Sequence, residues 1–361
     1  MAFLNYPELL SEAWAAHLAP RADDAPTVVS TFAGCGGSSL GYSMAGYREL
    51  LAVEWDANAC EHLRANFPGL SVWQGDIEKL EAAEVLERCR LEPGQLDVFD
   101  GSPPCQGFSI AGKRQLEDER NGLFREYVRL LCELRPRVFV MENVAGMVRG
   151  KMKLLFAEIL AELKACGYVV SARLLNAMYF SVPQSRQRLI FIGVRDDLAV
   201  APSHPKAEQR PLTVREAFMS LEPQTFAPPA KGQSFVLPFV RAGEAAVDVV
   251  PRHVLAKFIP RMAKQKPGGF TFHMVCKRLV PGRPSPTIPK TYIPYSHVPI
   301  HPTEHRFIAA EEAARLASFP DEYTFIGGYV DRIARIGNCV PPLFMRAIAS
   351  HVRREILEAL T

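Results

Sequence analysis

Residues 27–45 read TVVSTFAGCGGSSLGYSMA, an apolar run followed by a glycine-rich turn and a helical stretch. The β-branched residues in 27–33 predict a strand, and the turn at 34–39 leads into a helix. This order exposes backbone amides at a helix N-terminus, where open α/β sheets bind ligands. The spacing is not G-x-G-x-x-G and no Walker lysine follows, so the turn alone is equally compatible with a simple tight connection.

Two further predicted strands end in side chains suited to an adenosine. Residues 50–55 end in Glu54-Trp55, and residues 71–74 are followed by Asp76. An acidic residue at the end of the second strand is placed to bind ribose hydroxyls. Trp55 beside it is suited to stacking on adenine, and Asp76 to accepting a hydrogen bond from the adenine amine. Together with the glycine turn, these strand ends predict a cofactor that contains adenosine and needs no polyphosphate site.

A cysteine follows the fourth predicted strand. Residues 96–100, LDVFD, predict that strand, and residues 101–109, GSPPCQGFS, place Cys105 on a turn after it. The two prolines fix their own backbone angles and stiffen this turn. Because open α/β sheets carry their chemistry at the carboxyl ends of strands, Cys105 is a candidate nucleophile. A buried structural thiol is the competing interpretation. The polar residues 110–120 predict a mobile loop.

The next strand is also followed by a reactive group. Residues 138–141 predict a fifth strand, and Glu142 after it is a candidate general acid or hydrogen-bond partner. Arg186 and Arg188 alternate at the entry to a later strand, which directs both side chains to one face, either the catalytic cleft or a surface ion pair. Further patterns predict strands at 169–175 and 189–194 and helices at 122–134, 151–166, 309–319 and from about 342 to 360. Alternating strands and helices predict a doubly wound α/β fold with a mostly parallel sheet.

Composition narrows the class of protein. The chain has 361 residues, of which 48% are hydrophobic, and no apolar run is long enough to span a membrane. The N-terminal residues 1–20 make a poor signal peptide and read better as a short amphipathic helix of unknown purpose. The eight cysteines contain no C-x-x-C pair. This argues against a disulfide framework or a zinc site and for a reducing compartment, here the cytoplasm.

The charge is distributed unevenly. Residues 201–300 hold 14 Lys and Arg against 5 Asp and Glu, a net of +9, whereas the whole chain carries +3, so the remainder carries −6. The same segment holds 16 of the 29 prolines, which predicts loops more than regular elements. A basic, irregular segment in a mildly acidic chain indicates a polyanionic partner, although a solvated basic surface would have the same composition.

Taken in order, these blocks resemble the cytosine-5 DNA methyltransferase family, of the bacterial or phage modification type. The resemblance covers most of the chain outside 205–280. Three positions depart from the family pattern, since Ser30 replaces an aspartate, and Ala309 and Glu311 replace a threonine and an arginine. The matching motifs are Phe32-Ala33-Gly34-Cys35-Gly36-Gly37, Glu54-Trp55-Asp56, Gly75-Asp76-Ile77, Pro104-Cys105-Gln106, Glu142-Asn143-Val144, Gln184-Ser185-Arg186-Gln187-Arg188, Glu312-Ala313-Ala314-Arg315-Leu316 with Phe319-Pro320, and Gly337-Asn338 with Val340-Pro341.

The resemblance implies a reaction with named residues. The Cys105 thiolate adds to carbon 6 of a cytosine, and carbon 5 then takes a methyl group from S-adenosylmethionine, which leaves as S-adenosylhomocysteine. Glu142 contacts ring nitrogen 3 and the exocyclic amine, for which it has to be protonated or share a proton with the base. Arg188 holds the carbonyl oxygen, and Arg186 or Arg188 helps to stabilise the thiolate. No metal is implied. Because a stacked base is out of reach, the reaction implies base flipping.

The resemblance also assigns binding residues. Those for the cofactor are Phe32, Ala33, Gly34, Gly36, Gly37, Glu54, Trp55, Asp76, Ile77, Pro104, Leu123, Asn338 and Val340. Those for DNA are Gln106, Ser109, Lys113 and Arg114 after the nucleophile and, as candidates from the basic segment, Arg252, Arg261, Lys264, Lys277 and Arg278. The expected organisation is a catalytic domain of residues 1–204 and 303–361 with a target-recognition domain of residues 205–302. We expect a nucleoid-associated monomer on double-stranded DNA, with a cognate restriction endonuclease as a potential partner.

Two other functions fit the sequence in part. The tRNA-methylating branch of the same family carries a Cys-Phe-Thr tripeptide in its variable region, whereas Cys276 is followed here by Lys277-Arg278. A catalytically silent nucleic-acid-binding protein would be free to lose its reacting groups, yet Cys105, Glu142 and Arg188 are all present. The sequence therefore favours an active DNA methyltransferase, and it does not give the recognition site.

Overall fold

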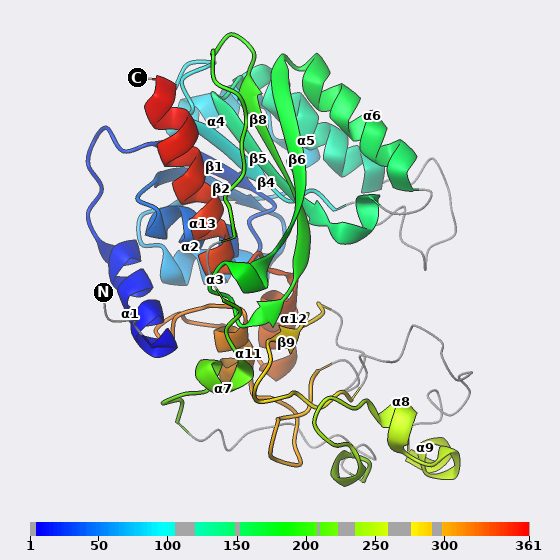
Figure 1. Ribbon diagram of the computed structural model, residues 1–361. Coiled ribbons are helices and arrows are strands. Elements are labelled where there is room, and N and C mark those ends of the chain that lie inside the picture. Colours follow the sequence, from blue (N-terminus) through cyan, green and yellow to red (C-terminus); the bar gives the residue numbers. More distant parts are fainter. Residues whose placement is uncertain are drawn as a thin grey trace.

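The centre of the molecule is a seven-stranded sheet with the strand order β3-β2-β1-β4-β5-β8-β6 (Figure 1). The computed structural model describes residues 5–104, 120–148, 152–207, 210–222, 235–258, 276–290 and 298–360. Five neighbouring strands are parallel, and β8 runs antiparallel to both of its neighbours. This confirms the predicted doubly wound, mostly parallel sheet. The strands are β1 (Thr27–Thr31), β2 (Arg48–Glu54), β3 (Ser71–Gln74), β4 (Val98–Gly101), β5 (Val138–Val144), β6 (Tyr168–Asn176) and β8 (Gln187–Arg195).

The strand order reverses at the centre of this sheet. β2 and β3 extend to one side of β1, and β4 and β5 extend to the other. Loops that leave the carboxyl ends of two such strands diverge and open a crevice, which is where ligands bind in doubly wound sheets. The glycine-rich turn follows β1, and the chain toward Pro104 follows β4. Topology alone therefore brings the expected cofactor turn and the approach to the expected nucleophile to one edge.

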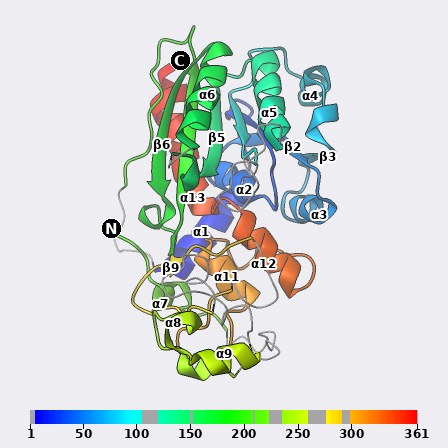
Figure 2. The ribbon, with the colours of Figure 1, turned by 90° about the vertical axis from the view of Figure 1, so that its right-hand side faces the viewer.

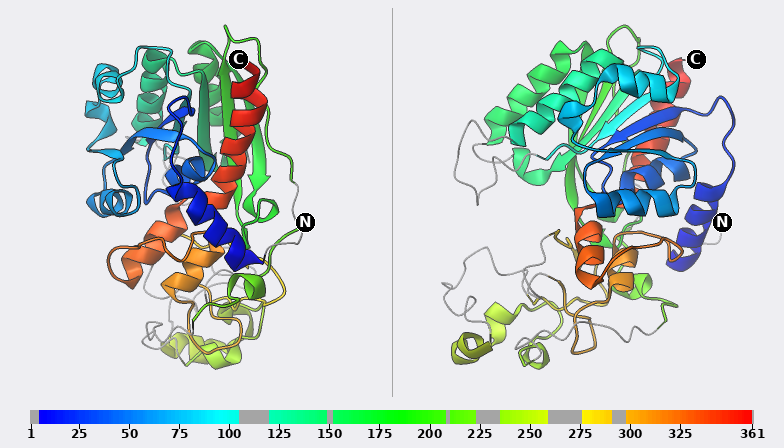
Figure 3. Two further views of the ribbon diagram at one scale, coloured as in Figure 1. Left: turned by 90° about the vertical axis from the view of Figure 1, so that its left-hand side faces the viewer. Right: turned by 180° about the vertical axis from the view of Figure 1, so that it is seen from behind.

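Helices cover both faces of the sheet (Figures 1 and 3). Within β1, Val28 packs toward one layer and Val29 toward the other. Because both faces are buried at the centre of the sheet, β1 and β4 are buried throughout and show no period of two. One layer contains α1 (Tyr6–Leu18), α2 (Gly37–Met44), α3 (Ala57–Asn66) and α13 (Pro342–Val352). The other contains α4 (Ala82–Cys89), α5 (Arg120–Leu134) and α6 (Met152–Ala165). No helix in the described ranges is long and apolar enough to cross a membrane.

The predicted end of one strand needs correction, and one helix was not predicted. β5 continues to Val144 instead of ending at Met141, because β8 pairs with it up to the partners Val144 and Arg188. Glu142 therefore lies within a strand and not after one. The helix α12 (Tyr329–Asn338) was not predicted, since it contains Gly337 in its last turn. A methyl group on Gly337 would lie 2.2 Å from the carbonyl oxygen of Pro289, so close packing explains this unfavourable helix residue.

The cysteine pattern argues against a disulfide framework, yet the structure contains one disulfide. Cys132 of α5 and Cys166, which follows α6, form a disulfide with 5.1 Å between their Cα atoms. The two residues are separated by 34 positions, and only the side-by-side packing of two helices on the same sheet face brings them together. The free cysteines of the described ranges are Cys35, Cys60, Cys89, Cys276 and Cys339.

Short elements outside the sheet come from residues 205–302. Figures 1 and 2 show α8 and α9 at the end of the molecule that is remote from the sheet, with α11 (Ala310–Leu316) and α12 in between. In both views the β6 arrow points toward this end, so the carboxyl ends of the parallel strands face it. The described elements of this segment are α7 (Val214–Ala217), α8 (Ala246–Val249), α9 (Arg252–Phe258) and β9 (Ser285–Pro286), which pairs with β7 (Gln184–Ser185).

Candidate active site

The glycine-rich turn after β1 is held by Glu54. One carboxylate oxygen of Glu54 accepts a hydrogen bond from the Gly34 amide at 2.7 Å, and the other accepts from the amides of Trp55 and Asp56 at 2.9 and 3.0 Å. Gly34 and Gly36 have φ angles of 57° and 85°, which only glycine adopts without strain. A methyl group added at Gly34 would meet no atom of the described residues within 4 Å, so these residues leave the space above the turn open.

The strand ends beside this turn present the side chains expected for an adenosine. Trp55 is 77% exposed, and its ring is available for stacking. Asp76 is exposed and accepts from the Glu78 amide at 3.2 Å, whereas the side chain of Ile77 is buried in the core. A carboxylate offers about four acceptor sites, so Glu54 can bind ribose hydroxyls in addition to the amides. These residues fit an adenosine-containing cofactor.

The remaining cofactor candidates surround the same edge. Gly37 begins α2, and a methyl group on it would lie 2.2 Å from the carbonyl oxygen of Val340, so the last motif packs directly on the turn. Val340 is buried and Asn338 is exposed. Of the others, Ala33 is buried, and Phe32, Pro104 and Leu123 are half-buried.

The expected nucleophile lies outside the described residues. This holds for Cys105 and equally for Gln106, Ser109, Lys113 and Arg114. The structure describes the chain up to Pro104, and Asn143 at the end of β5 donates a hydrogen bond from Nδ2 to the Pro103 carbonyl at 3.1 Å. Asn143 thus fixes the turn that leads to Cys105. Asn143 belongs to the motif Glu142-Asn143-Val144, but nothing in the sequence indicates this contact.

Glu142 and Arg188 form an ion pair with 2.5 Å between Oε1 and Nε. In the antiparallel ladder Glu142 lies opposite Ile190, so Arg188 is its diagonal neighbour on the same sheet face. Their side chains are only 12% and 14% exposed. The structure therefore brings together two of the predicted catalytic residues, next to the turn that Asn143 holds.

Arg186 has a different environment from the one expected. It is 3% exposed and donates hydrogen bonds to the carbonyls of Ile288, Gly337 and Cys339 at 3.2, 2.9 and 2.8 Å. Burial lowers the pKa of Arg186 to about 10, and the positive charge of Arg188 adds to this effect. The expectation that Arg186 faces the cleft and acts on the thiolate is therefore corrected. Its guanidinium instead connects the backbone at Ile288 to the backbone at 337–339.

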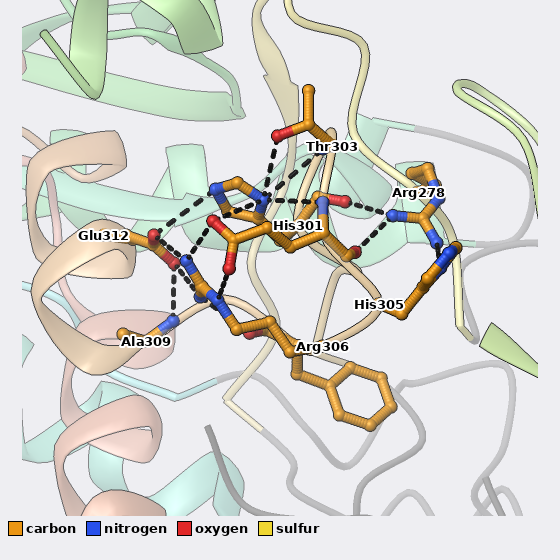
Figure 4. A network of polar contacts seen from close by, with 9 residues as sticks. Arg278, His301, Thr303, His305, Arg306, Ala309 and Glu312 are labelled. Carbon is orange, nitrogen blue, oxygen red and sulfur yellow. Dashed lines mark hydrogen bonds and ion pairs between the residues drawn. The ribbon is translucent and has the colours of Figure 1, made fainter. Parts of the chain in front are cut away.

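Arg278 also differs from the expectation. It is 4% exposed, and its guanidinium donates to the carbonyls of Val240 and Leu237 at 2.6 and 2.8 Å. It also donates to the His301 carbonyl at 2.6 Å (Figure 4). Because backbone carbonyls occupy the guanidinium of Arg278, this group is not available to a phosphate or a base. The expectation that Arg278 contacts DNA is therefore corrected. Of the other candidates, Arg252 is exposed at the start of α9, Lys277 is half-buried, and Arg261 and Lys264 lie outside the described residues.

A polar network connects this segment to α11. Glu312 accepts hydrogen bonds from both terminal nitrogens of Arg306 at 2.8 and 2.7 Å and from the amide of Ala309 at 2.7 Å (Figure 4). Ala309, which stands where the family has threonine, has no hydroxyl to cap the helix. Glu312 therefore binds the amide of Ala309, the residue before α11, and Arg306 balances the buried charge of Glu312.

Sequence reasoning missed two buried acids beneath α2. Glu49 accepts a hydrogen bond from the Ser39 hydroxyl at 2.9 Å, and Asp100 accepts from the Tyr42 hydroxyl at 3.2 Å. Burial raises the pKa of Glu49 to about 7 and that of Asp100 well above its usual range. Glu49 lies near the beginning of β2, Asp100 lies one residue before the end of β4, and no motif marks either acid. They contact the helix that starts at the cofactor turn.

Together, the sheet topology, the glycine turn at the strand reversal and the acid at the end of β2 define a Rossmann-like methyltransferase. The chain belongs to the C-5 cytosine-specific DNA methylase family, whose sequence profile matches residues 27–354. It is an S-adenosylmethionine-dependent DNA (cytosine-5) methyltransferase.

Relatives and solved structures agree with this family. Two Type II methyltransferases, M1.HphI of Haemophilus parahaemolyticus and M.DdeI of Desulfomicrobium norvegicum, are each 33% identical to this chain. The aligned regions cover 90% of this chain in both cases, and 86% of M1.HphI and 88% of M.DdeI. A structure assigned as a DNA modification methyltransferase from an Escherichia coli prophage is 26% identical and covers 92% of this chain and 100% of its own, with a TM-score of 0.70. Spodoptera frugiperda DNMT2, at 17% identity, 93% and 99% coverage and a TM-score of 0.64, shares the fold.

Proposed function

We propose that Cys105, Glu142 and Arg188 carry out methylation of a cytosine that is flipped out of double-stranded DNA. The observation that supports this most directly is the Glu142–Arg188 ion pair beside the turn that Asn143 holds. Glu142 lies on β5, next to β4, the strand that leads to Cys105, and Arg188 lies on β8, the strand beyond β5. A carboxyl and a guanidinium at this spacing suit the amine-bearing and carbonyl-bearing edge of one pyrimidine.

In this proposal the Cys105 thiolate forms a bond to carbon 6, and the electrons of the 5,6 double bond move toward carbon 5. Glu142 contacts nitrogen 3 and the exocyclic amine, and Arg188 contacts the carbonyl oxygen, so both stabilise charge that develops on the ring. After methylation of carbon 5, a base removes the proton from carbon 5. The carbon–sulfur bond then breaks, the double bond reforms and the thiolate leaves.

The cofactor is bound at the carboxyl ends of β1, β2 and β3. S-adenosylmethionine supplies a methyl group on a positively charged sulfur. Glu54 binds the ribose hydroxyls, Trp55 stacks on the adenine and Asp76 accepts from its amine. The open space above Gly34 and the exposed Trp55 ring support this placement. S-adenosylhomocysteine is the product that the site releases.

Residues 205–302 form the target-recognition domain, and residues 1–204 with 303–361 form the catalytic domain. The short elements and the net positive charge of this segment support the assignment. Arg252 and Lys277 remain candidates for DNA contact, as do Arg261 and Lys264. We further propose that the enzyme acts as a monomer in the cytoplasm on nucleoid DNA. The Type II relatives suggest a cognate restriction endonuclease for the same site.

The test is transfer of labelled methyl from S-adenosylmethionine to genomic DNA, followed by base-resolution mapping of the modified cytosines. Cys105→Ala should abolish transfer, whereas Cys89→Ala, which removes a free thiol in α4, should leave it unchanged. Modified cytosines within one short motif would support the proposal and supply the recognition site. Transfer to tRNA in place of DNA, or transfer by Cys105→Ala, would contradict it.

A further inference from the structure

One buried tyrosine contacts the cofactor turn from the far end of the chain. Tyr323 lies in the loop between α11 and α12 and is 4% exposed. Its hydroxyl donates a hydrogen bond to the backbone carbonyl of Cys35, 288 positions earlier, between Gly34 and Gly36 of the turn. This is a contact between backbone of the turn and a side chain that no cofactor motif contains.

The contact fixes more than one atom. Because a peptide unit is planar, holding the Cys35 carbonyl also holds the amide of Gly36 on the opposite side. That amide donates to the Ala33 carbonyl at 3.0 Å, which closes the turn. Burial raises the pKa of Tyr323 well above its usual range, so its hydroxyl remains a neutral donor at any working pH. Tyr323 therefore holds the peptide at the centre of the turn.

Aromatic packing determines the position of the Tyr323 ring. Its centroid lies 4.8 Å from that of Phe319 and 5.1 Å from that of Phe325. Trp14 of the N-terminal helix α1 packs edge-on against it at 6.4 Å, and Phe67 does so at 6.5 Å. Phe67 in turn supports the turn itself, because a methyl group on Gly36 would lie 2.7 Å from its ring.

The loop that carries Tyr323 is also anchored. Asn66 of α3 exchanges two hydrogen bonds with the Thr324 backbone, at 2.9 and 2.8 Å. His62, one turn earlier, accepts from the Ile326 amide at 3.0 Å. These three hydrogen bonds to α3, together with the packing of Trp14 from α1, hold the loop so that the Tyr323 hydroxyl lies against the turn.

We propose that Tyr323 is a positioning residue that sets the affinity for S-adenosylmethionine by holding the Cys35 peptide, and that α1 contributes by seating its ring through Trp14. This inference rests on the proposed cofactor site. It also gives a role to the N-terminal helix. A turn that is preorganised in its binding geometry loses less entropy when the cofactor binds, and this raises affinity without touching the reacting atoms.

The test is Tyr323→Phe, which removes the hydroxyl and keeps the ring. We expect the dissociation constants of S-adenosylmethionine and S-adenosylhomocysteine, measured by calorimetry without DNA, to rise about three- to tenfold, the usual effect of one hydrogen bond. The KM for S-adenosylmethionine should rise in parallel. The kcat at saturating S-adenosylmethionine and the KM for DNA should stay unchanged. Trp14→Ala should shift the same dissociation constants in the same direction.

The matched control is Tyr168→Phe. Tyr168 is also 4% exposed and donates to a backbone carbonyl, that of Pro136 at 2.7 Å, but at the amino-terminal edge of the sheet. The Tyr168→Phe variant should lower the melting temperature as much as Tyr323→Phe does, and it should leave cofactor binding unchanged. Unaltered binding by Tyr323→Phe, or an equal loss in Tyr168→Phe, would overturn the inference. If the wild-type enzyme bound neither nucleoside, the proposed function would fail first, and the inference with it.

Discussion

Arg188 and Glu142 are each other's charge partner, with 2.5 Å between Nε and Oε1, on one face of two antiparallel strands. Neither side chain is more than 14% exposed. Removing one member of an ion pair that is largely shielded from water leaves the other charge uncompensated. Each single substitution therefore costs more free energy than the intact pair contributes. A base that enters the site has to replace this mutual contact with contacts of its own.

Arg188→Ala and Glu142→Gln should each lower kcat about 10²- to 10³-fold, because each removes a group that stabilises developing charge on the ring. The dissociation constant of S-adenosylmethionine should stay unchanged, since neither side chain belongs to the proposed cofactor site. Single-turnover methyl transfer and calorimetry measure the two effects. The double variant should be less impaired than the product of the two single losses. Strict additivity would argue that the residues act independently.

Arg186→Met should destabilise the protein by about 3 kcal/mol, because it leaves the carbonyls of Ile288, Gly337 and Cys339 buried without a donor. Arg188→Met, two residues away, also costs stability because it leaves Glu142 without its charge partner, but unlike Arg186→Met it should lower the activity of the folded protein. Urea unfolding followed by circular dichroism measures both. An Arg186→Met protein of wild-type stability with lost activity would return Arg186 to the catalytic cleft.

Local sequence patterns predicted the sheet and the edge at which the candidate residues meet. The central strands are apolar runs with a glycine, a proline or an acid at or near their ends, and these signals are short-range. The functions of Arg186 and Arg278 could not be predicted in this way. An arginine that binds phosphate and one that binds carbonyls look alike in sequence, and only the surrounding backbone distinguishes them. The pairing of Cys132 with Cys166 could not be predicted for the same reason, because it depends on how two helices pack and not on the spacing of the cysteines.

Substitutions of the neighbours Arg278 and Lys277 should have different effects, one on folding and the other on DNA contact. Arg278→Ala should destabilise the basic segment, because four loop carbonyls lose their donor, and DNA binding should fall as a consequence. Lys277→Ala should leave proteolytic resistance unchanged and reduce the slope of log affinity against log salt by about 1, as expected for one phosphate contact. Fluorescence anisotropy across salt concentrations and limited proteolysis measure these effects. An unchanged slope would remove Lys277 from the DNA interface.

Glu49 makes stability depend on pH in the opposite sense to an ordinary carboxylate. Burial raises its pKa in the folded protein from 4.5 to about 7. Between these values the folded protein keeps a proton that the unfolded chain has lost. The stabilisation is therefore complete below pH 4.5 and is lost as pH rises through 7, by about 3 kcal/mol in all. Asp100, whose pKa is also raised by burial, acts in the same direction.

Glu49→Gln should remove this dependence, because glutamine stays neutral and its carbonyl oxygen can still accept from the Ser39 hydroxyl. The variant should match the wild type near pH 5 and exceed it at pH 8.5 by about 2.5 kcal/mol, the part of the Glu49 linkage that is lost above pH 5. Melting temperatures at both pH values measure the difference. Glu61→Gln, on the exposed side of α3, should change neither. A Glu49→Gln protein that is less stable at pH 8.5 would mean that the ionised carboxylate is needed beneath α2, and that its burial is offset by contacts of greater strength.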